Sequence, residues 1–337
     1  MSRLTTCSTT GSWTTAPSTS RPRLSRAGHR SGSENISQTC SSMWCCREQP
    51  LYVILPYFNF CGFKKRKNLF LEFVSRMLCV PGIRLVVAEY GQELPPLPVF
   101  KQFKFQIKNT IWIKENLVNR AVARLPADWR YVAWVDADIK FLNKRWVRDT
   151  VAALEQNDVV QLFHTAVNLG PDGESLKIDK SFGYMHAKSG TPLVKSDRYG
   201  FWHPGYGWAA TRQAWNKMGG LVDFAILGSA DRHMAMAWIG QVDMSYPGNI
   251  HPNYKALLKE YELLCKGFRV SYVPGTIVHY WHGSLENRQY RERWAIITKY
   301  DPFEDLDTSN ECVQLSTSGQ RFEKDILNYF LQRKEDS

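Results

Sequence analysis

Two aspartates separated by one small residue, Asp136 and Asp138, directly follow the apolar run Tyr131–Val135. In an extended or turning segment this spacing lets two carboxylates reach one hard cation, and Ala137 leaves room for a ligand to approach. Mg²⁺ or Mn²⁺ held by one or two carboxylates usually completes its coordination shell with substrate phosphates. The pair therefore predicts a divalent-metal site for a phosphorylated ligand, although two aspartates near a turn also suit a helix cap or an Asx turn.

Two histidines, His279 and His282, follow the apolar segment Val270–Val273. A neutral imidazole is a suitable third ligand for Mn²⁺ beside carboxylates. The sequence alone does not assign both histidines to the metal, because a histidine also serves as an ordinary structural residue. We favour His282, since the adjacent Gly283 lets the backbone approach a phosphate.

The elements around these residues follow a β-α-β order. Leu51–Pro56 and Ile83–Ala88 are short continuous apolar runs, as expected for strands covered on both faces. Between them lies a helical pattern of apolar positions, formed by Leu69, Phe70, Phe73, Val74 and Met77. A further helix is expected over residues 112–125, before the strand at 131–135. This order implies a parallel sheet with its ligand-binding loops at the carboxyl ends of the strands.

Composition narrows the class of protein. The 337 residues are 44% hydrophobic, which is enough for one large domain, and no apolar run approaches the roughly 18 residues that would cross a bilayer. The net charge is +11, and residues 51–300 hold 33 basic and 21 acidic residues, so the basic excess belongs to the expected catalytic domain. The eight cysteines form no CxxC pair, which argues against zinc knuckles and disulfide scaffolds and favours a reducing, cytoplasmic location.

The chain divides into three expected parts. Residues 1–50 are rich in Ser, Thr and Arg and should be disordered, either as a plain tail or as an organelle transit peptide. Residues 51–300 should form the catalytic domain. Residues 301–337 are acidic, and the apolar spacing over 322–334 predicts an amphipathic helix that packs on the domain or on a partner.

An ordered series of motifs over residues 51–295 resembles nucleotide-sugar glycosyltransferases of the GT-A fold. It is most similar to family-2-like and β-1,4-galactosyltransferase-like inverting enzymes. The motifs are Leu55-Pro56-Tyr57-Phe58-Asn59, Ala88-Glu89, Trp112 to Asn119, Trp134 to Asp138, His203 to Ala209, Gly219-Gly220-Leu221, Gly228 to Asp231 and His279 to Gly283. The resemblance implies an α/β fold with a mixed, mainly parallel sheet flanked by helices in a single catalytic domain.

The resemblance also implies how the donor is bound. The nucleoside would be gripped by Pro56, Tyr57, Asn59 and Glu89, with Glu89 accepting from a uracil N–H, and we favour a UDP-sugar as the donor. Core packing remains an equal alternative for Tyr57. Lys114, in the helix before the aspartates, would meet the diphosphate, a role that Arg120 or Lys101 could also fill.

On the acceptor side, the resemblance implies that Asp231 is the general base of an inverting reaction. Its position at the start of an expected helix also suits an N-cap, and one residue can serve in both ways. This sequence has a single aspartate where the galactosyltransferase pattern has a longer acidic run.

The aromatic stretch 202–208 suits sugar binding, because flat rings stack on the C–H faces of sugars. We expect Trp202 and Tyr206 to face the sugars, while Trp208 is either a donor contact or a core residue. The polar stretch 183–198 would form a lid over the donor.

The sequence therefore predicts a metal-dependent glycosyltransferase that uses Mn²⁺ or Mg²⁺, with Asp136, Asp138 and His282 or His279 as ligands. Its partners would be a nucleoside-diphosphate sugar and a glycan or other hydroxyl acceptor, with neither nucleic acid nor a transmembrane segment. Two alternatives remain. A sugar nucleotidyltransferase would require a Gly-rich segment with a basic residue after the first strand. A basic nucleic-acid-binding protein would require regularly spaced aromatic residues in a basic tract.

Overall fold

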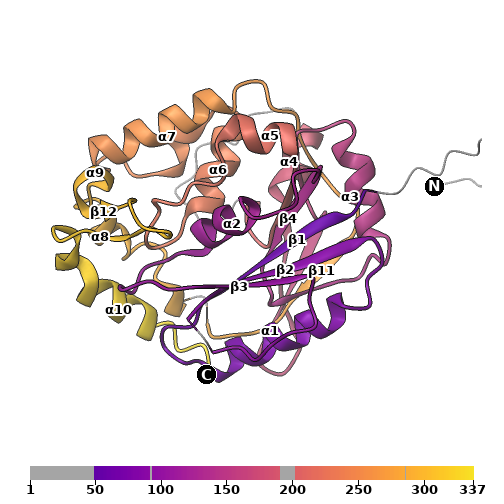
Figure 1. Ribbon diagram of the computed structural model, residues 1–337, viewed down its shortest axis with the longest axis horizontal. Helices are drawn as coiled ribbons and strands as arrows, with labels where there is room; N and C mark the ends of the chain where they lie inside the picture. Colours follow the sequence, from indigo (N-terminus) through magenta and orange to yellow (C-terminus); the bar gives the residue numbers. More distant parts are fainter. Residues whose placement is uncertain (1–48, 92, 190–201, 285) are drawn as a thin grey trace, which may run out of the picture. The chain divides into compact units, whose positions relative to one another are not determined.

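The structure is a computed structural model that describes residues 49–91, 93–189, 202–284 and 286–337 (Figure 1). The described residues belong to one compact unit. The tail predicted for residues 1–50 lies almost wholly outside the described residues, as does the second half of the lid predicted for residues 183–198. The first half of that lid belongs to helix α4 (Phe182–Ser189).

A seven-stranded sheet forms the centre of the unit, in the order β10-β6-β9-β4-β1-β2-β3. Its strands are β1 (Leu51–Tyr57), β2 (Ile83–Tyr90), β3 (Lys101–Phe105), β4 (Tyr131–Val135), β6 (Val159–Gln161), β9 (Gly207–Thr211) and β10 (Val270–Tyr272). β1 to β4 are parallel to one another, β10 is parallel to β6, and β9 runs antiparallel between β4 and β6. The mixed, mainly parallel α/β class predicted from the sequence is confirmed.

Strand β1 shows why its apolar run is continuous. Tyr52 and Ile54 belong to the apolar core on one face of the sheet, while Val53 and Leu55 belong to the core on the other face. Both faces are therefore covered, as expected for a central parallel strand. Pro56 lies beyond the last residue of β1 that pairs with β4, so its missing N–H leaves no hydrogen bond to that strand unmade.

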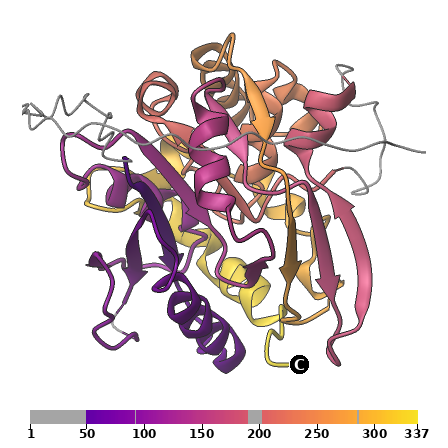
Figure 2. The same cartoon turned by 90° about the vertical axis from the view of Figure 1, so that its right-hand side faces the viewer.

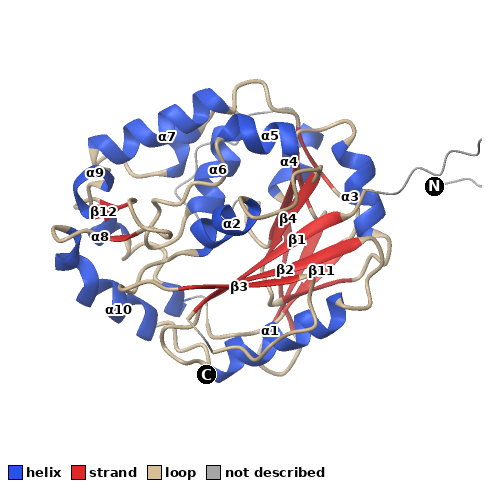
Figure 3. Cartoon of the chain, in the orientation of Figure 1, coloured by secondary structure: helices blue, strands red, loops and turns tan. Residues whose placement is uncertain are grey.

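Helices cover both faces of this sheet (Figure 3). Helices α1 (Lys64–Met77) and α3 (Trp146–Leu154) pack on one face. The other face carries α2 (Lys114–Val122), α5 (Arg212–Met218), α6 (Ala230–Trp238) and α7 (Pro252–Leu264). The remaining helical turns are η1 (Val242–Ser245), η2 (Glu286–Arg288), α8 (Trp294–Ile297), α9 (Pro302–Asp305) and η3 (Gly319–Phe322). Among the described residues, no helix is long and apolar enough to cross a membrane.

A second sheet of four strands, in the order β5-β11-β7-β8, lies beside the central one (Figure 2). It consists of β5 (Ile139–Phe141), β11 (Thr276–His279), β7 (Thr165–Leu169) and β8 (Ser175–Lys180). β5 and β11 are antiparallel, and Ile139 is opposite His279. This register places the residue before β5, Asp138, next to the segment that follows β11. A short pair, β12 (Leu306–Asp307) and β13 (Gln314–Leu315), completes the strands.

Strands β3, β5 to β9 and β11 to β13 were not predicted from the sequence, and two of them in the central sheet show why. β3 follows the Pro-rich loop and carries charged residues along an exposed edge, so it lacks the apolar run of the other strands. β9 begins at the end of the aromatic stretch 202–208, which we expected to bind sugars, and continues to Thr211. Its small residues Ala209 and Ala210 are fully buried between β4 and β6, and packing there, rather than an apolar run, defines the strand.

The acidic C-terminal segment is an integral part of the compact unit. Helix α10 (Glu323–Leu331) buries Ile326 and Phe330, and the Phe330 ring stacks on Trp112 with centroids 6.4 Å apart. The predicted amphipathic helix thus exists and packs on the domain, close to the start of α2.

This packing makes a prediction for α10. Ile326→Ala should lower the free energy of unfolding by about 2–5 kcal/mol, because it removes a fully buried side chain and leaves a cavity. The matched variant Leu327→Ala changes the neighbouring residue, which is 37% exposed, and should cost less than about 0.5 kcal/mol. Urea denaturation measures both. Equal effects of the two variants would mean that α10 does not fold with the rest of the unit.

Candidate active site

A cavity of about 470 Å³ opens at the carboxyl ends of β1 and β4. Pro56 and Tyr57 come from the end of β1, and Asp136 to Asp138 follow β4 directly. Because the carboxyl ends of parallel strands meet at one edge of a sheet, the predicted nucleotide-binding and metal-binding segments lie in the same cavity.

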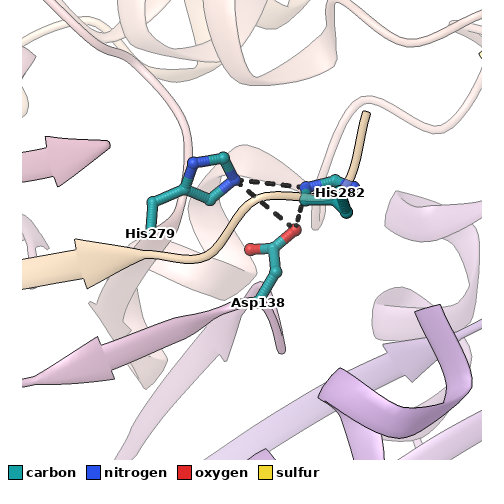
Figure 4. Close-up of side chains that lie close together, drawn as sticks. All are labelled: Asp138, His279 and His282. Atoms are coloured by element: carbon teal, nitrogen blue, oxygen red, sulfur yellow. Dashed lines mark hydrogen bonds and ion pairs between the residues drawn. The ribbon is translucent and has the colours of Figure 1, made fainter. Parts of the chain in front are cut away.

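Asp138, His279 and His282 converge at one part of the cavity wall (Figure 4). The Asp138 Oδ2 atom lies 2.8 Å from His282 Nε2 and 3.8 Å from His279 Nε2, and the two Nε2 atoms are 3.2 Å apart. The backbone N–H of Tyr280 donates to the carbonyl oxygen of Asp138 at 2.8 Å, which continues the pairing of β5 and β11 up to these side chains. Both histidines lie close to the Asp138 carboxylate, so both stay candidate metal ligands.

These three side chains fit a divalent cation. One ligand atom from each lies within 4.8 Å of the others, and carboxylate with imidazole is a donor set that suits Mn²⁺. The second carboxylate oxygen of Asp138 is buried and has no hydrogen-bond partner among the described residues. A buried acceptor of this kind is costly unless a proton donor or a cation satisfies it.

Electrostatics in this group favour the protonation states that metal ligands need. Burial acts to raise the pKa of Asp138, but His282 and His279 hold it well below its usual range. Burial lowers the pKa of His279 to about 3, although Asp138 opposes the shift. At neutral pH the group therefore contains an ionised carboxylate and a neutral His279 imidazole with a lone pair available for coordination.

Asp136 lies apart from this group and binds Lys114 instead. The Lys114 Nζ atom is 2.7 Å from Asp136 Oδ1 and 3.3 Å from Asp231 Oδ1. Lys114 is only 5% exposed, so its charge is not a solvated charge on the helix surface. Burial raises the pKa of Asp136 to about 6 even though Lys114 opposes the shift. The predicted pair of aspartates is thus divided, with Asp138 facing the histidines and Asp136 facing the lysine.

Asp231 lies in the first turn of α6 and lines the cavity. The N-cap of this helix is Ser229, so the N-cap role considered for Asp231 is wrong. Its carboxylate accepts from Lys114 Nζ at 3.3 and 3.4 Å. A Cβ atom added to Gly205 would lie 3.2 Å from Asp231 Oδ2, so a glycine at this position allows the backbone to approach the carboxylate closely.

Two non-glycine residues at the cavity have left-handed backbone conformations. Ser229 has φ 78°, and Tyr206 has φ 73°. The backbone carbonyl oxygen of Tyr206 accepts a hydrogen bond from the backbone N–H of Asp136 at 2.8 Å. The Tyr206 hydroxyl donates to Asn168 Oδ1 at 2.5 Å. Strained backbone of this kind persists where the surroundings over-determine it, and it is often found at functional sites.

Aromatic rings continue from Tyr206 along the cavity wall. The His203 ring stacks on Tyr206 with centroids 3.8 Å apart and planes 2° from parallel, and Tyr206 lies 4.8 Å from His279. Trp202 also lines the cavity, as expected for a sugar contact. Burial lowers the pKa of His203 to about 4, so its imidazole is neutral at pH 7.

Some predicted donor contacts lie outside the cavity. Asn59 does not line it; its side chain instead closes a turn with the backbone of Phe63. Glu89 is fully buried, and its oxygens accept from the Leu94 backbone N–H at 2.7 Å and from Gln102 Nε2 at 3.0 Å. The carboxylate is used to fix the loop after β2, so the structure does not support its predicted contact with a base.

Trp208 is also a core residue. It is 1% exposed, and its indole N–H donates to the Pro204 carbonyl oxygen at 2.7 Å. It is absent from the cavity lining, in agreement with the core-packing alternative. Tyr57 is 2% exposed and combines both expectations, because it packs on Phe70 and still lines the cavity. Lys101 and Arg120, the alternatives to Lys114, do not line it.

A group of cavity residues from the C-terminal part of the chain was not predicted from the sequence. Arg288, Arg333 and Glu335 line the cavity together with Arg66 from α1. Arg66 belongs to a basic run that composition does reveal. Arg333 and Glu335 carry no local signal, because a charged residue near a chain end is ordinarily solvated and only the packing of α10 brings these two inward.

Comparisons with known proteins give distant similarities only. No protein-family model and no curated protein matches the sequence. Among solved structures, Drosophila β1,4-galactosyltransferase 7 in complex with xylobiose is similar at 12% identity and a TM-score of 0.39, covering 81% of this chain and 97% of that one. Glucosyl-3-phosphoglycerate synthase from Mycobacterium tuberculosis, in complex with Mn²⁺, UDP-glucose and phosphoglyceric acid, is similar at 13% identity and a TM-score of 0.40. The similarity covers 74% of this chain and 78% of that one.

A third similar structure is 4-diphosphocytidyl-2C-methyl-D-erythritol synthase from Anaerococcus prevotii, at 11% identity and a TM-score of 0.30, with 75% of this chain and 98% of that one covered. At such low identities and scores these likenesses do not decide between activities. The functional conclusion therefore depends on the geometry of the site.

The metal group makes a direct prediction. Asp138→Asn, His279→Ala and His282→Ala should each weaken Mn²⁺ binding on the order of 100-fold, because the first removes the negative charge of the carboxylate ligand and the other two each remove a nitrogen donor. Asp179→Asn is the matched control, since Asp179 is a cavity carboxylate that pairs with Lys177 and lies outside the group. Calorimetry with Mn²⁺ alone measures the change. Undiminished affinity in Asp138→Asn would exclude this group as the metal site.

A second prediction concerns Glu115, which is 3% exposed and accepts from Trp112 Nε1 at 3.0 Å. Burial raises its pKa from 4.5 to about 8. The folded chain holds this proton more tightly than the unfolded chain, so the contribution to stability is full below pH 4.5 and is lost as the pH rises towards 8. Glu115→Gln should therefore raise the melting temperature at pH 8.5 more than at pH 5.5. An equal change at both values would show that the carboxyl is already ionised.

Proposed function

We propose that this protein is a metal-dependent glycosyltransferase that moves a sugar from a nucleoside-diphosphate sugar to an acceptor hydroxyl with inversion. One observation carries the proposal: a single cavity contains both a group suited to a divalent cation and a separate carboxylate, Asp231, that is held by a buried lysine. Transfer from such a donor needs a place for the diphosphate and, apart from it, a base for the acceptor.

The donor would lie between the end of β1 and the metal group. Pro56 and Tyr57 line this part of the cavity, and Trp112 adds an aromatic surface. A planar base can pack against such side chains, which supports a nucleotide in this position. We favour a UDP-sugar, as the resemblance of the motifs implied. A divalent ion held by Asp138, His279 and His282 would offset the negative charge that develops on the leaving diphosphate.

Asp231 would act as the general base. Its carboxylate takes the proton from the acceptor hydroxyl as the acceptor oxygen bonds to the anomeric carbon. The bond from that carbon to the donor phosphate breaks, and the nucleoside diphosphate leaves with the electron pair. Lys114 fixes the carboxylate by hydrogen bonds and balances its charge, and Gly205 leaves space beside it.

The aromatic wall would orient the sugars. Trp202, His203 and Tyr206 line the cavity, and the stacked rings of His203 and Tyr206 form a continuous surface next to His279. Sugar C–H faces pack on such surfaces while polar neighbours take the hydroxyl groups. Lys177 and Asp179, which also line the cavity, can supply those hydrogen bonds.

The proposal is tested by separating donor binding from transfer. A thermal-shift screen of UDP-, GDP- and CDP-sugars with Mn²⁺ first identifies the donor. Asp231→Asn should then bind that donor as wild type does and lose about 10²- to 10⁴-fold in the rate of transfer, because only proton removal is affected. Donor turnover is followed by the release of nucleoside diphosphate.

The outcomes distinguish the alternatives. Wild-type transfer rates in Asp231→Asn would move the base elsewhere. Formation of a nucleotide sugar with release of pyrophosphate would identify a nucleotidyltransferase. Tight binding of DNA or RNA, with no stabilisation by any nucleotide sugar, would overturn the proposal altogether.

A further inference from the structure

A fully buried carboxylate from the C-terminal turn lies in the cavity wall. Glu335 is 0% exposed, and its oxygens accept from Arg66 Nε at 2.7 Å and Nη2 at 2.5 Å. Arg333 donates from Nε to the same carboxylate at 2.7 Å. Two-pronged pairing of this kind holds a guanidinium group in one orientation, which long side chains otherwise lack.

Two guanidinium groups bind this carboxylate, and a third lies beyond His282, whose Nδ1 atom is 3.7 Å from Glu335 Oε2. Arg66 and Arg333 bind it directly, and Arg288 lies 2.8 Å from His282 Nε2 through its Nη2 atom. The Arg333 side chain is 5% exposed and lies over the Trp112 ring, 5.5 Å from its centroid. All three arginines and Glu335 line the cavity.

The charges of this wall do not balance among themselves. Glu335 offsets one of the three positive charges, and Asp138, the next acid along the wall, would share its own charge with a metal ion. Arg333 is buried, whereas Arg66 and Arg288 are partly exposed to the cavity. Excess positive charge held in the wall of a cavity attracts an anion into it. Forked guanidinium groups match the oxygens of phosphate better than ammonium groups do.

The turn that carries Arg333 and Glu335 is anchored to two other parts of the site. The Asp336 carboxylate accepts from the backbone N–H groups of Lys64 and Lys65 at 3.1 and 2.8 Å, at the start of α1. Gly283, next to His282, has φ 88°, and a Cβ atom there would lie 2.9 Å from the Arg333 carbonyl oxygen. The backbone of the turn therefore lies against the segment that carries a candidate metal ligand.

We propose that the C-terminal turn Arg333–Asp336 forms one wall of the donor site, in which Arg66, Arg288 and Arg333 bind the diphosphate and Glu335 holds two of these arginines in place. The inference rests on the proposed function for the identity of the anion. It assigns a binding role to a segment that the sequence presents only as an acidic end of the chain.

The test compares neighbouring residues of the turn. Arg333→Met keeps most of the side-chain volume, removes one guanidinium group and leaves Glu335 paired with Arg66, so the variant retains a partner for the buried carboxylate. It should weaken binding of inorganic pyrophosphate, measured by calorimetry with and without Mg²⁺, by about tenfold to a hundredfold. Lys334→Met is the matched control, because it removes the same charge from an exposed neighbour, and its affinity should stay within about twofold of wild type.

A second variant guards against misfolding of the first. Arg288→Gln removes a guanidinium group that is not bonded to Glu335 and should also weaken pyrophosphate binding, with a melting temperature close to that of wild type.

Unchanged pyrophosphate affinity in folded Arg333→Met, or equal losses in Arg333→Met and Lys334→Met, would overturn the inference even if transfer is observed. Loss of pyrophosphate binding in Arg333→Met but not in Lys334→Met supports the anion site, even if no sugar donor is turned over. In that case only the proposed function fails.

Discussion

The antiparallel pairing of β5 with β11 is the constraint on which the site depends. Its register sets Ile139 opposite His279, and the hydrogen bond from the Tyr280 N–H to the Asp138 carbonyl oxygen extends that pairing by one residue. Side chains that are far apart in the sequence therefore meet at one point, where the carboxylate of Asp138 reaches His279 and His282. A shift of one residue would turn these side chains to the other face of the strand.

The buried Lys114 binds Asp136, so Asp136 and Asp138 have different partners. The Lys114 ammonium group needs negative partners because it is removed from water, and it finds them in Asp136 and Asp231. This arrangement leaves Asp138 to the imidazoles. It also ties the end of β4 to the start of α6, so the candidate metal group and the candidate base are positioned relative to each other through one side chain.

The C-terminal segment links the stability of the unit to the geometry of the cavity. Helix α10 packs on Trp112 through Phe330, and the Tyr329 hydroxyl donates to the Arg288 carbonyl oxygen at 3.2 Å. The turn that follows contributes Glu335 to the cavity wall. Core packing and the placement of the cavity arginines are thus consequences of the same contacts, which helps to explain why an amphipathic helix lies beside the site.

The sequence by itself determined the buried parallel strands, the helices between them and the position of Asp136 and Asp138 at a strand end, because these depend on local apolar periodicity. Tertiary structure alone decided which residues the individual side chains contact. The Glu89 carboxylate accepts a hydrogen bond from the loop that follows β2 instead of facing the cavity. Trp208 is a core residue, and Glu335 is buried. Local patterns cannot specify such outcomes, since each depends on contacts between segments distant in sequence and on the cost of burying a charge without a partner.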